Sequence, residues 1–480
     1  MLAEHTIAGA DEPRDVAMVA TANEMVDIML GILADGLDHP ELWPHIPDYL
    51  GANPLIADVL LQRLAAVRGA KAAPIKILLA MCGAALGNVA DMTEVLADLS
   101  ADFSQSPLVQ GALFHMRGLQ HPGDPRYVLE GRMCETPFEQ LDVLDGSSHL
   151  CCASWLGTSI GSLSDGMWQD VWNSPTAEAI RTSIHDGSYR YCNKGACPKI
   201  QSNALPTKNE LANSSPQWDQ VVAERATIMP SGPKVVNLAY DRTCNLACPS
   251  CRVERYAADD VTRTRYAEIQ ERAILPMLKT ADTVFVTGSG DPFASKNFRQ
   301  LMSALTPEHY PDLKFQIMTN GMLFTARQWD AFPSLHRRVA LLKISIDAAT
   351  GPTHEVLRLG AHWPTVMENM TFAGTLLANG LIDNLELVFT VQEDNFREMG
   401  DAVDLAHRVG ANGIFFARLT NWGTFSPEAY RRKAIFLPSH PDHAAFRHAM
   451  EDERLADPIV LLGDLQGFRT QDTASRLFVR

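Results

Sequence analysis

The sequence predicts an α/β protein whose largest part is a partial (β/α)6 TIM-like barrel, preceded by a helical domain and a small cysteine-rich module. Three observations predict this organisation. After about residue 233, six short apolar runs typical of buried strands alternate with stretches typical of helices. In the first 125 residues, apolar side chains recur every three or four positions. Between these regions the chain is rich in turn residues and holds five of its nine cysteines.

The helical domain is expected to cover residues 1–125. One apolar helical face is formed by Val19, Ala22, Val26, Met29 and Leu33, and a second one by Ile56, Leu60, Leu64 and Val67. Asn53-Pro54 stands before the second face, as is typical of a helix start. No motif in this region carries chemistry, so we expect a helical cap or docking domain.

The cysteine-rich module is expected at 126–205 and a linker at 206–232, because polar and turn residues dominate from Ser202 to Pro216. The barrel is expected at 233–440. Its predicted strands are 234–240, 283–287, 314–319, 339–345, 384–390 and 413–417, with helices between them such as 262–280 and 394–409. Right-handed crossovers curl such a series into a partial barrel, with ligand loops at the carboxyl ends of the strands. Residues 441–480 are predicted to add a helix and a strand.

The charge balance bears on partners. Lys and Arg number 41 and Asp and Glu 57, so the formal net charge is −16. This argues against nucleic acid or an anionic membrane as a partner, since both attract clustered positive charge. The longest uncharged apolar stretch, 77–90, is shorter than the roughly 20 residues of a membrane-spanning helix. The first residues lack the basic and apolar regions of a secretory signal. We therefore expect a cytoplasmic protein.

The nine cysteines predict two metal or cluster sites. An odd number of cysteines without an export signal argues against a disulfide framework. Cys82 lies alone in an apolar run and is expected to be a buried thiol. The other eight form two groups, one of Cys134, Cys151, Cys152, Cys192 and Cys197, the other of Cys244, Cys248 and Cys251.

The second group has the spacing C-x3-C-x2-C and follows the first predicted barrel strand directly. Three thiolates at this spacing can converge on one face of a tight loop. A [4Fe–4S] cluster normally takes four cysteine ligands, so three would leave one iron open for a small molecule. Zinc is the alternative, although structural zinc sites usually have four protein ligands.

This loop resembles the cluster loop of the radical S-adenosylmethionine (SAM) superfamily. Further likenesses follow the second, third and fourth strands and the helix beyond: Gly288-Ser289-Gly290-Asp291-Pro292, which is similar to the GGEP motif, Thr319-Asn320-Gly321, Ser345-Ile346-Asp347 and Arg358-Leu359-Gly360. The likeness covers about 233 to 420. Ser250 stands where many members have an aromatic residue, and Asp291 is one methylene shorter than the GGEP glutamate. The residues that the resemblance implies in SAM binding are Ser289, Gly290, Asp291, Pro292, Asn320, Ser345, Asp347 and Arg358.

The resemblance implies a radical SAM enzyme. In this family, Cys244, Cys248 and Cys251 would hold a [4Fe–4S] cluster whose open iron chelates SAM. One electron, delivered by a reductant such as flavodoxin or ferredoxin, splits the sulfonium C–S bond and leaves a 5′-deoxyadenosyl radical. That radical abstracts a hydrogen atom from an unactivated C–H bond of the substrate. The protein supplies binding, orientation and exclusion of side reactions.

The first cysteine group resembles the SPASM or twitch extension of radical SAM enzymes, as does the sequence around Trp168, Trp172 and Arg181. In this family the extension binds an auxiliary [4Fe–4S] cluster. Here the module precedes the barrel, whereas in the better-known members it follows. The ligands would be Cys134, one of Cys151 and Cys152, Cys192 and Cys197. Adjacent side chains on extended chain point opposite ways, so one of the pair is expected to be spare, and Cys151 is preferred as ligand. Structural zinc or unligated thiols are the alternatives.

A fully ligated auxiliary cluster would have an electronic role, which points to an oxidoreductase-type reaction. The substrate is expected to be a peptide or a small, sugar-like metabolite, because the first 125 residues lack the opening hairpin of a leader-binding winged helix. The alternative function is a non-catalytic iron–sulfur electron carrier or sensor. That alternative predicts clusters but does not account for the motifs at 288–292 and 345–347.

Overall fold

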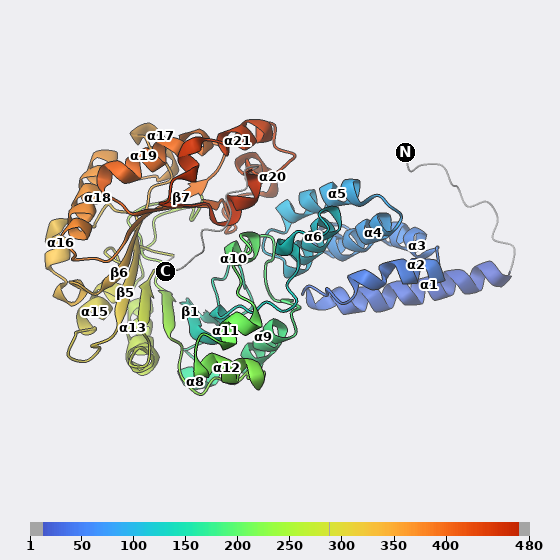
Figure 1. Ribbon diagram of the computed structural model, residues 1–480, viewed down its shortest axis with the longest axis horizontal. Helices are drawn as coiled ribbons and strands as arrows, with labels where there is room; N and C mark the ends of the chain where they lie inside the picture. Colours follow the sequence, from blue (N-terminus) through green and yellow to red (C-terminus); the bar gives the residue numbers. More distant parts are fainter. Residues whose placement is uncertain (1–12, 288, 470–480) are drawn as a thin grey trace. The chain divides into compact units, whose positions relative to one another are not determined.

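The computed structural model describes residues 13–287 and 289–469 and consists of two compact units (Figure 1). The N-terminal unit comprises Met1–Leu129 together with Ser188–Gly195. The barrel unit comprises Glu130–Gly187 and Ala196–Arg480. The short segment Ser188–Gly195 thus belongs to the N-terminal unit, although it falls inside the predicted cysteine-rich module.

The N-terminal unit is helical, as predicted. Its α-helices are α1 (Pro13–Ile32), α2 (Ile46–Ala52), α3 (Ile56–Ala66), α4 (Ala73–Ala85), α5 (Val89–Asp102) and α6 (Pro107–Gln120). Ala22, Val26, Met29 and Leu33 lie in the core, which confirms the predicted face of α1 except for Val19, which is exposed. Cys82 is buried in α4, and burial raises the pKa of its thiol to about 11.

The segment Ser188–Gly195 belongs to this unit through specific polar contacts. The Lys194 ammonium forms a buried ion pair with the Asp38 carboxylate at 2.5 Å. The Asn193 side-chain amide donates a hydrogen bond to the Ser104 carbonyl at 2.7 Å. Separating a buried ion pair is strongly unfavourable, because it leaves an uncompensated charge in the interior.

One segment of the described chain, Val16–Asp35, has the length and mean hydropathy (1.6) to cross a membrane. A search for uncharged runs misses it because Glu24 and Asp27 interrupt it. Core helices of soluble proteins meet the same two criteria, and Val26 and Met29 of this helix lie in the core of the unit.

The barrel unit is built on one nine-stranded sheet with the order β2-β1-β3-β4-β5-β6-β7-β8-β9. The strands are β1 (Gln140–Leu144), β2 (Ser147–His149), β3 (Val235–Ala239), β4 (Thr283–Val286), β5 (Lys314–Thr319), β6 (Val339–Ser345), β7 (Leu385–Val391), β8 (Gly413–Arg418) and β9 (Val460–Leu461). All neighbours pair in parallel except β1 and β2, which form a hairpin. Strands β3 to β8 lie within one residue of the six predicted strands. The predicted fold class is confirmed.

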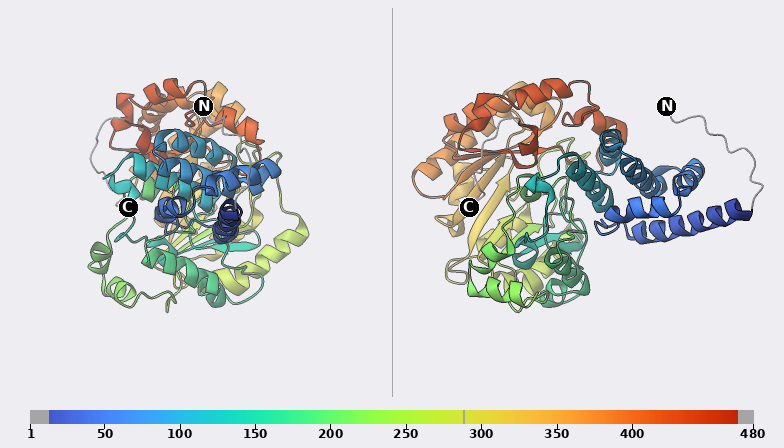
Figure 2. Two further views of the ribbon diagram at one scale, coloured as in Figure 1. Left: turned by 90° about the vertical axis from the view of Figure 1, so that its right-hand side faces the viewer. Right: turned by 45° about the vertical axis from the view of Figure 1, so that its right-hand side comes forward.

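Helices cover the outer side of the curved sheet (Figures 1 and 2). They are α13 (Asp260–Ile269), continued by a π turn and α14 (Leu275–Leu278), α15 (Lys296–Ala304), α16 (Ala326–Asp330), α17 (Gly351–Leu357), α18 (Trp363–Ala378) and α19 (Met399–Val409). Strand side chains on the helix-covered side, such as Val236 and Ile317, are fully buried. The alternate side chains form the inner face, where Lys343 and Glu386 make an ion pair of 2.7 Å.

The cysteine-rich module contributes β1 and β2 to the sheet, together with α7 (Thr136–Glu139), α8 (Trp168–Trp172), α9 (Pro175–His185) and α10 (Pro198–Gln201). Strand β1 pairs in parallel with β3, the first barrel strand, so that Asp142 lies opposite Asn237. The Asn237 amide donates a hydrogen bond of 2.7 Å to the Asp142 carboxylate. The module is therefore part of the barrel sheet.

The stretch 206–232, predicted as a linker, is folded against the barrel unit. It forms α11 (Lys208–Ala212), which begins with a capping box of Thr207 and Glu210, and α12 (Pro216–Ala223). Trp218 is buried on α12. The linker prediction was wrong because the polar composition reflects the solvent face of short helices whose few apolar residues pack inward.

The C-terminal stretch adds α20 (Pro427–Lys433), α21 (His443–Ala449) and strand β9, which pairs with β8. The helix and strand predicted for 441–480 are thus confirmed as α21 and β9, and residues 470–480 lie outside the described residues. His440 and His443 donate hydrogen bonds to the carbonyls of Arg432 and Ile435.

Candidate iron–sulfur cluster sites

The C-x3-C-x2-C loop follows β3 at the carboxyl ends of the parallel strands. Its three cysteines are free thiols. The Cys244 amide donates to the Tyr256 carbonyl, and the Cys251 amide donates to the Cys248 carbonyl, both at 2.9 Å. These bonds fold the loop back on itself between Cys244 and Tyr256. Burial raises the pKa of Cys248 to about 11, and a neighbouring Arg358 opposes that rise.

Loops from three other strands hold the cysteine loop in place. The Asp291 amide donates to the Thr243 carbonyl at 2.9 Å, and the Ala247 amide donates to the Leu359 carbonyl at 3.0 Å. The Asn320 side-chain amide reaches the Cys244 sulfur at 3.6 Å. The structure therefore brings together the motifs that sequence alone placed after β3, β4, β5 and near α17.

Gly290 lies against the backbone of the cysteine loop. A Cβ atom at this position would be 2.5 Å from the Asp241 carbonyl oxygen and 2.6 Å from that of Thr243. Only glycine permits this approach. Its neighbour Ser289 donates a hydrogen bond to the Ala239 carbonyl at the end of β3. Gly288, the first residue of the motif, lies outside the described residues.

The Asp291 carboxylate is fully buried and accepts hydrogen bonds on both oxygens. One oxygen accepts from the Thr319 hydroxyl at 2.7 Å and the Asn320 amide at 3.0 Å, the other from the Phe293 and Ala294 amides. Burial raises the pKa of Asp291, and these donors oppose the rise. Asp291 thus ties the β4 loop to the β5 loop, and the buried Pro292 continues the turn.

Asp347 and Arg358 form an ion pair of 2.7 Å, and both groups act electrostatically on Cys248. Asp347 has a left-handed backbone (φ 51°) and accepts a hydrogen bond from the Thr390 amide. Burial by itself lowers the pKa of Arg358, but Asp347 and Cys248 outweigh it, so its pKa is raised. The Nε atom of Arg358 has no hydrogen-bond partner among the described residues. Ser345, on the inner face at the end of β6, is also buried.

Three thiols of the cysteine-rich module interact with one another. Burial raises the pKa of Cys151 well above its usual range, and Cys197 and Cys134 raise it further. Burial also raises the pKa of Cys197, to about 12, with Cys134 adding to the effect. Lys199 pairs with Glu135 at 2.5 Å, and the neighbouring Cys134 raises its pKa against the effect of burial. Cys134, Cys151 and Cys197 thus form one group of thiols beside a cation.

The two other predicted ligands differ from this group. The Cys152 sulfur lies 3.2 Å from the Ser154 hydroxyl. The choice of Cys151 as the ligand of the pair stays a prediction. Cys192 lies in the segment that belongs to the N-terminal unit, so its role as a ligand stays a prediction.

Both thiol groups fit iron–sulfur clusters in their donor chemistry. Bound iron would replace the thiol protons, which burial otherwise holds in place. In the described part of the chain, no three His, Cys, Asp or Glu side chains are arranged to hold a single metal ion.

Arg252 contacts the cysteine loop, and the sequence did not single it out. It follows Cys251 directly, is buried, and donates a hydrogen bond to the Cys251 sulfur at 3.4 Å. A basic residue after a motif gives no signal by itself, because the contact depends on how the loop folds.

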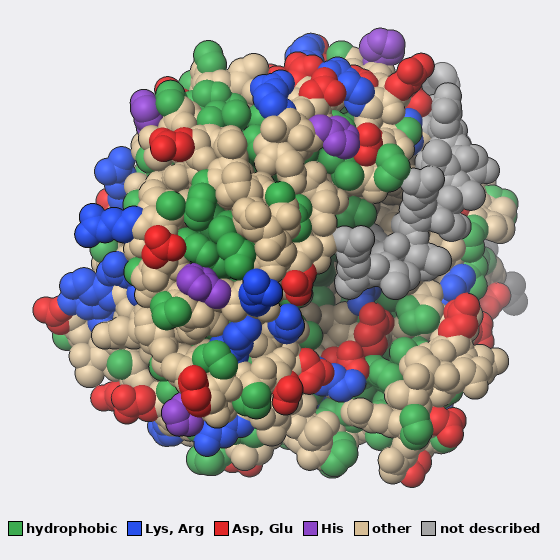
Figure 3. Space-filling view, turned by 60° about the vertical axis from the view of Figure 1, so that its left-hand side comes forward, with side chains coloured by type: hydrophobic (Ala, Val, Ile, Leu, Met, Phe, Trp, Pro, Cys, Tyr) green, Lys and Arg blue, Asp and Glu red, His purple; other side chains and the backbone are tan. Residues whose placement is uncertain are grey.

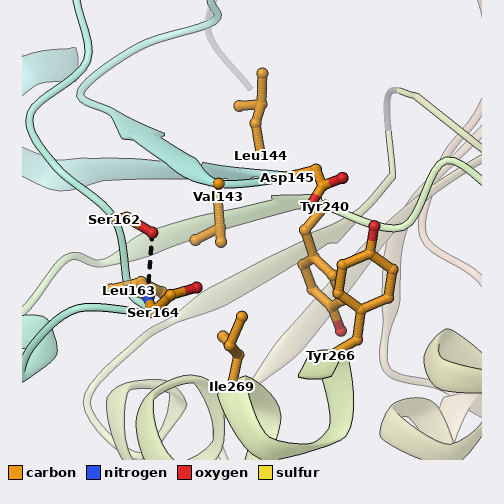
Figure 4. A pocket seen from close by; sticks show the side chains of 10 residues that line it. Val143, Leu144, Asp145, Ser162, Leu163, Ser164, Tyr240, Tyr266 and Ile269 are labelled. Atoms are coloured by element: carbon orange, nitrogen blue, oxygen red, sulfur yellow. Dashed lines mark hydrogen bonds between the residues drawn. The ribbon is translucent and has the colours of Figure 1, made fainter. Parts of the chain in front are cut away.

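A small cavity lies between the module and the barrel, lined by Val143, Leu163, Tyr240, Tyr266 and others (Figure 4). Its volume of about 10 Å³ is roughly that of one water molecule. The Tyr240 and Tyr266 rings line it, with their centroids 5.1 Å apart. It is therefore too small for a substrate.

On the face shown in Figure 3, acidic and basic side chains are interspersed.

The buried carboxyl of Asp142 predicts a pH-dependent stability. Burial raises its pKa to about 6, against hydrogen bonds from Gln140 and Asn237. The folded chain therefore holds this proton more tightly than the unfolded chain, where the pKa is about 3.9. The contribution of this group to stability is greatest below about pH 4 and falls by at most about 3 kcal/mol as the pH rises to about 6.

We expect Asp142→Asn to remove this fall. The variant should gain stability relative to wild type between pH 4 and pH 7, measured as the difference in free energy of unfolding in urea. The Asn237 side-chain oxygen has no hydrogen-bond partner among the described residues. If the Asn237 amide flips, this oxygen can accept a hydrogen bond from the new Asn side chain at position 142. If the two proteins differed in free energy of unfolding by the same amount at pH 4 and pH 7, the raised pKa of Asp142 would be contradicted.

Residues 134–198 match the family model of SPASM, an iron–sulfur cluster-binding domain. The chain therefore contains a SPASM domain, and the predicted iron–sulfur module is confirmed. No curated protein sequence matches the chain.

Solved structures similar to the chain include Streptococcus suis SuiB bound to S-adenosylmethionine, with 14% identity, 52% of this chain and 53% of SuiB covered, and a TM-score of 0.33. Native anSMEcpe with bound AdoMet and Kp18Cys peptide has 17% identity, 39% and 52% coverage, and a TM-score of 0.29. TYW1 with a lysine-pyruvate adduct has 14% identity, 42% and 66% coverage, and a TM-score of 0.28. The chain spans about half to two thirds of the length of these proteins.

Proposed function

We propose that the chain is a radical SAM enzyme of oxidoreductase type, with a SAM-binding [4Fe–4S] cluster on Cys244, Cys248 and Cys251. The observation that carries the proposal is the convergence of four separate loops on these three thiols. These loops place Gly290 against the backbone of the cysteine loop, the Asn320 amide at the Cys244 sulfur, and an ion pair beside Cys248. Unrelated turns after successive strands would not be expected to combine these three features.

A cluster held by Cys244, Cys248 and Cys251 would supply the electron for the reductive cleavage of SAM. This chain's residues hold and orient the cofactor. Arg358, with its free Nε donor and its charge beside Cys248, is suited to a carboxylate or hydroxyl group of SAM. Ser345 at the end of β6 and the half-buried backbone around Ser289 and Gly290 offer further polar contacts. Asp291 supports the β4 and β5 loops by accepting hydrogen bonds from the Phe293 and Asn320 amides.

The SPASM domain would hold the auxiliary [4Fe–4S] cluster on Cys134, Cys151, Cys197 and Cys192. With four cysteine ligands it has no open iron, so its role is to accept or relay an electron. This supports a net oxidation of the substrate. Lys199 lies beside the cluster site and partly offsets the negative charge of the thiolates.

The substrate class is a peptide or a small, sugar-like metabolite. Lys343 and Glu386 place opposite charges on the inner face of the sheet, where a polar substrate can pair with them. A low-potential one-electron donor such as flavodoxin or ferredoxin would be the redox partner. Location in the cytoplasm, without nucleic acid or membrane partners, stays a prediction.

The test is an anaerobic assay for 5′-deoxyadenosine with SAM and dithionite, together with an iron count. Wild type should form 5′-deoxyadenosine and carry about eight irons in two clusters. The Cys244/Cys248/Cys251→Ala variant should form none and retain about four irons in the SPASM domain. Absence of 5′-deoxyadenosine from fully loaded wild type would instead favour a non-catalytic electron carrier or sensor.

A further inference from the structure

Arg252 places a permanent positive charge at the cysteine loop. Its side chain is buried, with 7% of its surface exposed. One guanidinium nitrogen donates to the Arg242 carbonyl at 2.7 Å, and the other donates to the Cys251 sulfur at 3.4 Å and to the Ser289 carbonyl. Three contacts from three directions fix the guanidinium group against the loop.

The described hydrogen-bond partners of Arg252 include a sulfur and no carboxylate. Its described hydrogen-bond partners are two neutral carbonyls and one thiol, whereas Arg358 is paired with the Asp347 carboxylate. A guanidinium group stays protonated in proteins, so this side chain is charged at every working pH.

Among the described residues, the other donors to the motif thiols are neutral. The Leu246 amide and the Asn320 side chain approach the Cys244 sulfur at 3.5 and 3.6 Å. Hydrogen bonds that involve a charged group are about twice as strong as neutral ones. In a partly desolvated loop, a fixed charge also acts over a longer range than a dipole.

We propose that Arg252 is a positioning residue that raises the one-electron reduction potential of the cluster held by Cys244, Cys248 and Cys251. The inference rests on the proposed function, since it assumes that cluster. Reduction adds one electron, supplied by a flavodoxin- or ferredoxin-type donor or by dithionite, and no bond in Arg252 changes. The added negative charge is stabilised by a guanidinium that hydrogen-bonds a ligand sulfur, so the reduced state gains more than the oxidised state.

The experiment is a redox titration of the reconstituted full-length protein without SAM, followed by electron paramagnetic resonance. The spectrum of the Cys244/Cys248/Cys251→Ala variant is subtracted to remove the auxiliary cluster. Arg252→Gln removes the charge, Arg252→Lys keeps it, and Arg327→Gln removes an exposed arginine of α16 as a matched control.

At the potential where the wild-type cluster is half reduced, Arg252→Gln should lower the ratio of reduced to oxidised cluster at least about tenfold, which is about 59 mV for one electron. Arg252→Lys should show a smaller fall, and Arg327→Gln no change. Full cluster loading with an unchanged potential in Arg252→Gln would overturn the proposal. Loss of the cluster from both Arg252 variants would also overturn it, in favour of a role in assembly. A wild type that binds no cluster at the three cysteines would instead contradict the proposed function itself.

Discussion

Gly290→Ala should abolish most SAM cleavage. The new methyl group would stand 2.5 Å from the Asp241 carbonyl and 2.6 Å from the Thr243 carbonyl, both of them backbone atoms that no rotamer change can move away. Either the β4 loop or the cysteine loop must shift, and the hydrogen bond from the Asp291 amide to Thr243 lengthens. A misplacement of about 1 Å in an active site costs about 100-fold in rate, so we expect at least that loss.

The measurement is the rate of 5′-deoxyadenosine formation per cluster, with iron counted on each sample. Gly166→Ala is the matched control, because a Cβ there meets nothing within 4 Å and the backbone is not left-handed. The control should keep wild-type activity. A Gly290→Ala protein with wild-type rate and iron content would show that the close approach has no role in catalysis.

Arg181→Met should destabilise the barrel unit by about 3 to 5 kcal/mol. Arg181 is fully buried in the SPASM domain and stacks on the Trp172 ring, 4.5 Å from its centroid. It donates hydrogen bonds to the carbonyls of Pro137, Trp172 and Thr227, at 2.7 to 3.0 Å. Methionine fills similar space but removes the donor from these three carbonyls. Burial lowers the pKa of Arg181 to about 9, so the group is still charged at neutral pH.

The measurement is the free energy of unfolding of the barrel unit from denaturant titration, analysed as its own transition. Arg327→Met, on the exposed face of α16, is the control and should change stability by less than about 0.5 kcal/mol. A loss below about 1 kcal/mol for Arg181→Met would mean that water replaces the guanidinium, and that this group does not join the SPASM domain to the segment before β3.

Local pattern was enough to predict most of the barrel. Strands β3 to β8 are short apolar runs between turn residues, and their limits follow from where the apolar run ends. The cysteine spacing and the motifs after each strand also lie within short segments, so their order along the chain could be read directly. The fold then brings Asn320 to Cys244 because parallel strands end at one edge of the sheet.

Contacts between distant segments were not predictable in the same way. The pairing of β1 with β3 joins residues about 95 positions apart, and no spacing rule reports it. The helices of 206–232 have only a few apolar residues, so their composition resembles a linker. Arg252 looks like any basic residue after a motif until the loop closes around it. Cys192 lies within the SPASM match, but the buried pair of Lys194 and Asp38 assigns its segment to the other unit.

The pairing of β1 with β3 has a consequence for the independence of the barrel. In a barrel that began at Lys234, β3 would be an edge strand, with a row of unpaired amide and carbonyl groups beside the cysteine loop. Such edges pair readily with other chains, and natural proteins cover them. The hairpin of β1 and β2 covers this one, so the SPASM domain also protects the barrel from self-association. The module with one group of cysteines thereby shields the strand that leads to the other group.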